Sequence, residues 1–144
     1  MRTTLLTAIA ALGLATTALA ESHGGGGDVE AGEKAFKKCL SCHAVVAEDG
    51  TVVVKGGKTG PNLYGVLGRP AAAEDGYRYK AGILEAAEKG LVWDEANFVA
   101  YLQDPSGFLK EFTGDSGARS GMSFRLRKGM EDVYAYLLSV GPEM

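Results

Sequence analysis

Both cysteines of the chain lie within four residues of a histidine, in the run Cys39-Leu40-Ser41-Cys42-His43. Cys-x-x-Cys-His is the attachment signature for haem. Two thiols that are separated by two residues can add to the two vinyl groups on one side of a porphyrin, and the adjacent imidazole is then held beneath the iron. The motif therefore predicts one covalent haem c, bound through Cys39 and Cys42 and ligated by His43.

Other chemistries of paired cysteines fit the chain less well. A disulfide between Cys39 and Cys42 would close a very small loop and contribute little stability. A thioredoxin-type pair begins a helix after a strand in an α/β chain, whereas this pair follows a predicted helix in a chain with few strands. A zinc site needs four ligands, and the chain offers these cysteines, His43 and the remote His23. Chance occurrence of the motif is the remaining alternative.

An amphipathic helix leads into the cysteine motif. Asp28 is suited to cap the start of a helix, and Val29, Gly32 and Phe36 recur at helical spacing. These features predict a helix over residues 29–40, which delivers the two cysteines. A glycine inside a helix costs roughly 1 kcal/mol relative to alanine, which suggests a close contact at Gly32.

The middle of the chain is rich in glycine. Residues 44–69 carry six glycines and Pro61, so loops and turns are expected there. The run Thr51 to Val54 predicts a brief, peripheral hairpin. Residues 79–89 predict a short helix with Gly90 as its C-cap.

The last third of the chain predicts two more helices around a loop. One helix starts at Asp94 and ends before Pro105. Residues 108–123 are expected to be a loop, and this loop carries Met122. The last helix shows an apolar face made by Val133, Tyr136, Leu137 and Val140.

These elements predict an all-α fold of four to five helices connected by long loops. Long glycine-rich loops are a poor way to build a core of this size. A porphyrin would supply a large apolar plate around which helices and loops could bury their side chains. The fold prediction and the haem prediction therefore support each other.

The N-terminus indicates export. Residues 1–20 predict a signal peptide, with an apolar run from Leu5 to Ala15 and small residues at positions 18 and 20 for cleavage after residue 20. An uncleaved anchor is the alternative, but the apolar segment is short against the ~20 residues that span a membrane. Residues 21–27 predict a flexible glycine-rich segment, and 28–144 a single domain.

The charge of the exported chain is acidic. Without Arg2 it keeps 14 basic and 18 acidic residues, a net charge of −4. This balance disfavours nucleic acid as a partner.

A haem iron with six ligands needs a partner opposite His43. The sulfur and imidazole candidates are Met122, Met130, Met144 and His23. Met122 lies on a glycine-rich loop far along the chain and could fold over the opposite haem face. Histidine and methionine together would occupy both axial positions, which favours outer-sphere electron transfer. A haem sensor or peroxidase-like enzyme with an open axial site, and a thiol oxidoreductase, are the alternatives.

Longer motifs run from Asp28 to about Leu138. They are Gly27-Asp28-Val29-Glu30-Ala31-Gly32 with Phe36, Lys58-Thr59-Gly60-Pro61-Asn62-Leu63-Tyr64-Gly65 with Arg69, Gly76-Tyr77-Arg78-Tyr79, Trp93, Tyr101-Leu102, Met122-Ser123-Phe124, and Asp132 to Leu137. With these motifs the chain resembles the class I c-type cytochromes. It is most similar to the long soluble periplasmic cytochromes of photosynthetic and denitrifying proteobacteria.

The resemblance implies a role for further residues. It makes Met122 the sixth ligand, and it makes the Pro61 carbonyl the acceptor of the His43 ring N–H. Tyr101 would form a hydrogen bond near the Met122 sulfur. Gly32 and Phe36 would meet the last helix near Val133 and Tyr136. The residues implied to hold the haem propionates are Arg69, Tyr79 and Trp93.

The resemblance also implies a function. It predicts a monomeric periplasmic electron carrier, not an enzyme, that takes electrons from a membrane cytochrome bc complex. The acceptor would be a terminal oxidase, a nitrogen-oxide reductase or a photosynthetic reaction centre. Two basic clusters could steer acidic partners, namely Lys34, Lys37 and Lys38, and Arg119, Arg125, Arg127 and Lys128. The chain departs from the family in its acidic net charge and in Ser120-Gly121, where Thr-Lys is more familiar.

Overall fold

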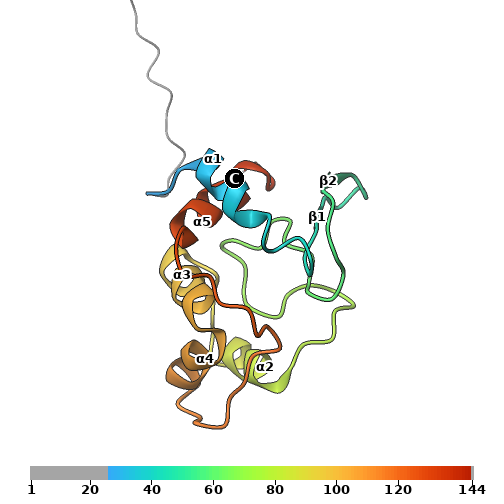
Figure 1. Ribbon diagram of the computed structural model, residues 1–144. Coiled ribbons are helices and arrows are strands. Elements are labelled where there is room, and N and C mark those ends of the chain that lie inside the picture. Colours follow the sequence, from blue (N-terminus) through green and yellow to red (C-terminus); the bar gives the residue numbers. More distant parts are fainter. Residues whose placement is uncertain (1–25, 144) are drawn as a thin grey trace, which may run out of the picture.

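A computed structural model describes residues 26–143, and in this part of the chain the helices form an arc that long loops close on the other side (Figure 1). The predicted signal peptide, residues 21–25 with His23, and Met144 lie outside the described residues. The elements are α1 (Val29–Phe36), β1 (Val45–Val46), β2 (Val52–Val54), α2 (Ala81–Glu88), α3 (Glu95–Gln103), α4 (Pro105–Thr113) and α5 (Met130–Ser139). The predicted helical fold with long loops is confirmed.

Helices α1 and α5 cross at a glycine. A β-carbon on Gly32 would collide with the backbone carbonyl of Asp132 and with the Tyr136 side chain. One turn further on, the rings of Phe36 and Tyr136 lie 5.4 Å apart. The close crossing expected near Val133 and Tyr136 is therefore confirmed.

The start of α1 is fastened to α5. The Asp28 carboxylate accepts from the Ala31 N–H at 2.7 Å and caps the helix. The Asp28 N–H in turn donates to the Asp132 carboxylate at 2.8 Å. Gly27 already packs against the Glu131 carbonyl, so the packed part of the chain includes the last residue of the predicted flexible segment.

Helix α1 ends four residues earlier than expected. The prediction extended it to residue 40, but the last helical residue is Phe36. The N–H groups of Lys38 and Cys39 bond three residues back, to Ala35 and Phe36, so the chain tightens into turns. These turns carry the cysteine motif at the end of the helix.

The prediction of a loop over residues 108–123 is wrong in its first half, because α4 occupies Pro105–Thr113. Pro105 stops α3 and also starts α4, since a proline fits the first turn of a helix. The Asp104 carboxylate caps that turn by accepting from the Gly107 N–H at 3.1 Å. Residues 114–123 remain a loop.

Helix α2 lies beside α4. It begins at Ala81 instead of Tyr79, and Gly90 follows its end with a positive φ of 83°. Lys89 joins the two helices because its ammonium pairs with Glu85 at 3.0 Å and donates to the Thr113 carbonyl at the end of α4. The cap predicted at Asp94 for α3 is also present, with the Asn97 N–H as donor at 2.8 Å.

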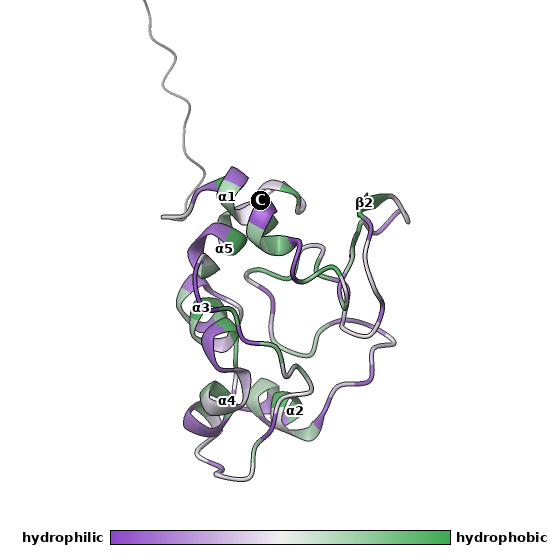
Figure 2. Ribbon diagram, in the orientation of Figure 1, coloured by the Kyte–Doolittle hydropathy of each residue, from purple (hydrophilic) through white to green (hydrophobic). Residues whose placement is uncertain are grey.

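The buried side chains form two clusters, and the helices alternate hydrophobic and hydrophilic positions (Figure 2). One cluster joins α1, α3 and α5, and the other joins α2 and α4 with the segment around Trp93. The predicted hairpin is present, with Val45 of β1 paired with Val54 of β2. It is not wholly peripheral, because Val45 is fully buried in the first cluster. Among residues 26–143, no helix has the length and apolar character needed to cross a membrane.

Candidate functional site

A cavity of about 380 Å³ lies between the two buried clusters. Its volume falls in the range of ligand sites in proteins, roughly 300–1,000 Å³. All of the predicted site residues line it, namely Cys39, Cys42, His43, Pro61, Arg69, Tyr79, Trp93, Tyr101 and Met122. Residues that are far apart in the sequence are thus brought together around one space.

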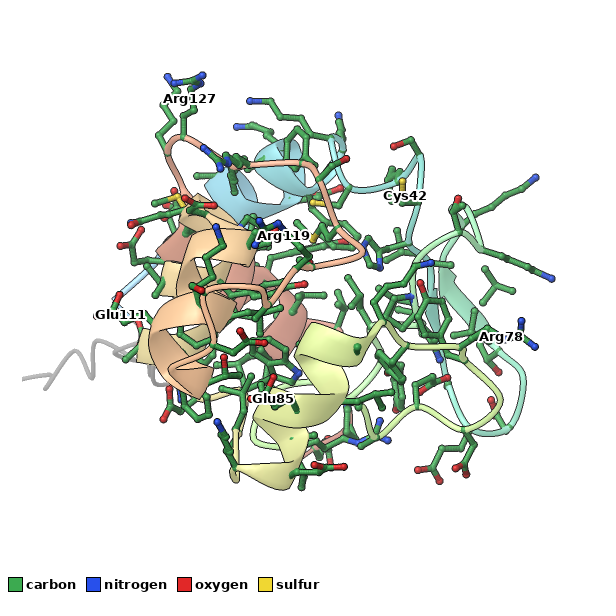
Figure 3. All side chains as sticks on the ribbon, turned by 90° about the horizontal axis from the view of Figure 1, so that it is seen from below. Cys42, Arg78, Glu85, Glu111, Arg119 and Arg127 are labelled. Carbon is green, nitrogen blue, oxygen red and sulfur yellow. The ribbon has the colours of Figure 1, made fainter. Side chains whose placement is uncertain are left out.

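The two cysteines stand on one wall of this cavity as unbridged thiols. Cys42 is exposed, on the loop that follows α1 (Figure 3), and Cys39 is partly buried. Burial and, to a smaller extent, the neighbouring Cys42 raise the pKa of the Cys39 thiol to about 11, against the opposing effect of Lys38. In the unmodified chain, Cys39 is therefore a neutral thiol near pH 7.

His43 is held in one tautomer. Its Nδ1 lies 2.8 Å from the Pro61 carbonyl, which can only accept a hydrogen bond, so Nδ1 carries the proton. The lone pair of Nε2 is then free for a metal. Burial lowers the pKa of His43, although the bond to Pro61 acts in the other direction, and the neutral ring is the form that binds metals.

The neighbouring glycine makes room for this ring. A β-carbon on Gly60 would collide with the His43 imidazole, so the chain can pass the ring closely only without a side chain there. Gly60 belongs to the sequence motif Lys58 to Gly65, and sequence reasoning assigns it no individual role. The contact depends on a chain reversal between residues 43 and 60, which spacing alone does not reveal.

Met122 is carried by a loop that is bonded to α3 and α4. The Met122 N–H donates to the Ser120 hydroxyl at 2.9 Å, and that hydroxyl lies 2.6 Å from the Tyr101 hydroxyl. The Ser120 N–H donates to the Ser106 hydroxyl on α4 at 3.1 Å. Tyr101 therefore reaches the Met122 segment through Ser120, a residue that sequence reasoning noted only as a departure from the family.

The other sulfur candidate within the described residues lies elsewhere. Met130 is 7% exposed and packs in the hydrophobic cluster at the start of α5. It does not line the cavity, whereas Met122 does.

Polar groups collect at the part of the cavity formed by residues 69–79. Arg69 donates to the Ala73 carbonyl at 2.7 Å and lies 3.7 Å from the Glu74 carboxylate. The Tyr79 hydroxyl accepts from the Glu74 N–H at 3.2 Å, and burial raises the pKa of Tyr79. Tyr77, which had no predicted role, also lines the cavity and donates to the Thr59 carbonyl at 2.8 Å.

The remaining wall is apolar and aromatic. The rings of Trp93 and Tyr101 meet edge to face at 4.9 Å. Further apolar lining comes from Phe36, Leu63, Val66, Ile83, Phe98, Leu102, Val133 and Leu137. Two thiols, an imidazole with a free nitrogen and a thioether around an apolar cavity are the groups that a haem c requires, so the residues present fit that cofactor.

Comparison with known proteins also indicates a protein that binds haem c. Cytochrome c-551 of Roseobacter denitrificans is 57% identical over 114 residues, which cover 79% of this chain and 81% of the relative. Cytochrome c-550 of Paracoccus versutus is 49% identical over 145 residues, covering 99% of this chain and 92% of the relative. The solved structure of cytochrome c2 from Paracoccus denitrificans matches with a TM-score of 0.78 at 50% identity, over 81% of this chain and 98% of that one.

The fold, the cavity and these similarities define the family: the chain belongs to the class I c-type cytochromes, in the branch that contains cytochromes c2 and c-550. It is an electron-transfer protein and not an enzyme. It carries one haem c, attached through Cys39 and Cys42. No protein-family model matches the chain.

Proposed function

We propose that this cytochrome is a soluble, monomeric shuttle of the periplasm. It takes single electrons from a membrane cytochrome bc complex and delivers them to a terminal oxidase, a nitrogen-oxide reductase or a photosynthetic reaction centre. The observation that carries the proposal is that His43 and Met122 line one cavity together with both cysteines, at a site that exposes Cys42 to solvent. Residues 1–20 would act as the signal peptide, cleaved after Ala20.

Two residues of the chain, His43 and Met122, would ligate the iron of the cofactor. His43 would present Nε2, because the Pro61 carbonyl keeps the proton on Nδ1. Met122, which lines the same cavity, would present its sulfur. When bound, the haem supplies an iron that changes oxidation state by one electron. With His43 and Met122 both bound to the iron, no position would remain for a substrate, and the chemistry supplied would be the transfer of single electrons.

Polar residues would bind the haem propionates and the loop that carries Met122. Arg69, Tyr79 and Trp93 line the same cavity and can offer hydrogen bonds to carboxylates. Tyr101 would act near the Met122 sulfur, and its bond to the Ser120 hydroxyl supports that placement. Burial raises the pKa of Tyr101, so its hydroxyl stays protonated near pH 7.

Ligation by Met122 is tested by replacing each methionine in turn. Met122→Ala in the holoprotein is expected to abolish the sulfur-to-iron charge-transfer band of the oxidised form and to open the reduced form to carbon monoxide. Met130→Leu is the matched control, because Met130 is buried outside the cavity, and it should keep the band. Loss of the band in the Met130 variant and its retention in the Met122 variant would reverse the assignment.

A further inference from the structure

The side-chain amide of Asn62 forms hydrogen bonds with one edge of the hairpin, as the backbone of a neighbouring strand would. Its Oδ1 accepts from the Val46 N–H at 2.9 Å, and its Nδ2 donates to the Val46 carbonyl at 2.8 Å. On the side of β2, the Ala47 N–H donates to the Thr51 carbonyl at 2.9 Å. Backbone groups alternate sides along a strand, so the amide of Asn62 pairs with the edge of β1 that β2 leaves uncovered.

Only an amide can make this pair of bonds. Asparagine offers a carbonyl oxygen and an NH₂ group in a peptide-like arrangement, whereas a carboxylate accepts only. The Asn62 Oδ1 also accepts from the Tyr64 N–H at 3.2 Å, so the side chain fixes the turn that it belongs to. The Asn62 side chain therefore forms three hydrogen bonds, two with Val46 and one with Tyr64.

This side chain stands next to the residue that contacts the proposed iron ligand. The Pro61 carbonyl, which immediately precedes Asn62, accepts from His43 Nδ1 at 2.8 Å. The outgoing and returning segments are joined by the Gly60 N–H to the Cys42 carbonyl at 2.8 Å and the Leu63 N–H to the Ala44 carbonyl at 3.0 Å. Asn62 adds the bonds to Val46, so Pro61 is anchored on both sides.

We propose that Asn62 is a positioning residue for His43: its amide holds the Pro61 carbonyl against the hairpin and so sets the strength of the hydrogen bond to His43 Nδ1. The inference rests on the proposed ligation of the iron by His43. A firm bond at Nδ1 raises the basicity of the ligating nitrogen. A looser bond weakens electron donation by the ring, favours the reduced state and raises the reduction potential.

The test uses three variants of the holoprotein. Asn62→Leu removes all three bonds of the side chain. Asn62→Asp keeps an acceptor for the Val46 N–H but loses the donor to the Val46 carbonyl, and it serves if the leucine variant does not fold. Asn97→Leu is the control, because Asn97 also donates to a valine carbonyl, that of Val92 at 3.0 Å, but it does not line the cavity.

Two measurements separate positioning from stability alone. NMR hydrogen exchange of the His43 ring N–H is expected to become about tenfold faster in Asn62→Leu, the factor that corresponds to losing one hydrogen bond. The backbone amides of α5 report global opening and serve as the reference. The reduction potential is expected to rise in Asn62→Leu and to stay constant in Asn97→Leu. Asn62→Asp adds a negative charge, which by itself lowers the potential, so this variant is judged by the exchange of the His43 ring N–H.

The contrary outcomes are distinct. If the Asn62 variants lose stability but keep both the relative exchange of the His43 ring N–H and the reduction potential, Asn62 is a turn residue only and the proposal is overturned. If the wild-type protein shows no signal of an iron-bound histidine, ligation by His43 fails, and the inference fails with it.

Discussion

The Tyr101 hydroxyl connects a side chain of the cavity wall with the loop that carries Met122. It lies 2.6 Å from the Ser120 hydroxyl, which in turn accepts from the Met122 N–H. Removal of the Tyr101 hydroxyl therefore leaves Ser120 with one partner fewer, at a cost of about 1 kcal/mol for a hydrogen bond of this kind.

The raised pKa of Tyr101 gives this contribution a pH dependence. Burial is the main cause, and the bond to Ser120 opposes it. Because the folded state prefers the protonated hydroxyl, the contribution is fully present below the unfolded pKa of about 10 and is lost as the pH rises beyond it. We expect the stability difference between the wild-type protein and Tyr101→Phe to shrink as the pH rises above about 10. Urea unfolding of both holoproteins from pH 7 to 11 measures it, and a constant difference would contradict the expectation.

Sequence reasoning predicted the local part of the candidate site, and it missed the contacts that depend on the fold. Cys39, Cys42 and His43 are neighbours, so their chemistry follows from spacing alone. The roles of Gly60 and Ser120 depend on contacts with His43 and Tyr101, which are distant along the chain. Such contacts leave no periodic signal in one sequence.

At the scale of the element, the crossing of α1 and α5 depends on Gly32. Alanine is the better helix former by roughly 1 kcal/mol, but its β-carbon would collide with the Asp132 carbonyl. Overpacking of this kind costs about 1–3 kcal/mol, so we expect Gly32→Ala to destabilise the protein in spite of its helix propensity. Thermal and urea unfolding of the holoprotein measure the effect.

Gly26→Ala is the matched control for this change. A β-carbon at Gly26 meets no atom within 4 Å, so its effect should stay within about 0.5 kcal/mol. If Gly32→Ala proved as stable as this control, α1 and α5 would not be in close contact at that point.

The elements themselves were predictable to different degrees. Caps at Asp28 and Asp94 and the glycine after α2 are local signals, and the structure contains all three. Helix α4 was missed because Pro105 can end one helix and begin the next, and its glycine-rich continuation favoured a loop. The choice is made by packing, since Leu109 of α4 is fully buried in the cluster with α2.

At the scale of the whole molecule, the predicted basic clusters bear on partner binding. In the view of Figure 3, Arg127 and Cys42 lie in the upper half of the picture, and Glu111 and Glu85 lie below them. Not every basic side chain is equally available: Arg125 is paired with Asp104 at 2.8 Å, and Arg119 donates to the Ala118 carbonyl at 2.9 Å. A local basic face can steer an acidic partner although the exported chain has a net charge of −4.

We therefore expect the association rate with an acidic redox partner to fall as the salt concentration rises. Lys128→Gln should lower the rate at low salt and flatten its salt dependence. Lys110→Gln makes the same change of net charge on α4 and should have a smaller effect. Stopped-flow kinetics over a range of ionic strength measures both variants, and equal effects would show that net charge acts instead of a defined face.

The covalent cofactor is the claim on which all of these predictions depend. An intact mass under denaturing conditions, taken with the absorption spectrum of the exported protein, tests it most directly. The expected result is the mass of residues 21–144 plus one haem, with a haem c spectrum that persists after denaturation. A colourless protein with the mass of the bare polypeptide would contradict attachment through Cys39 and Cys42.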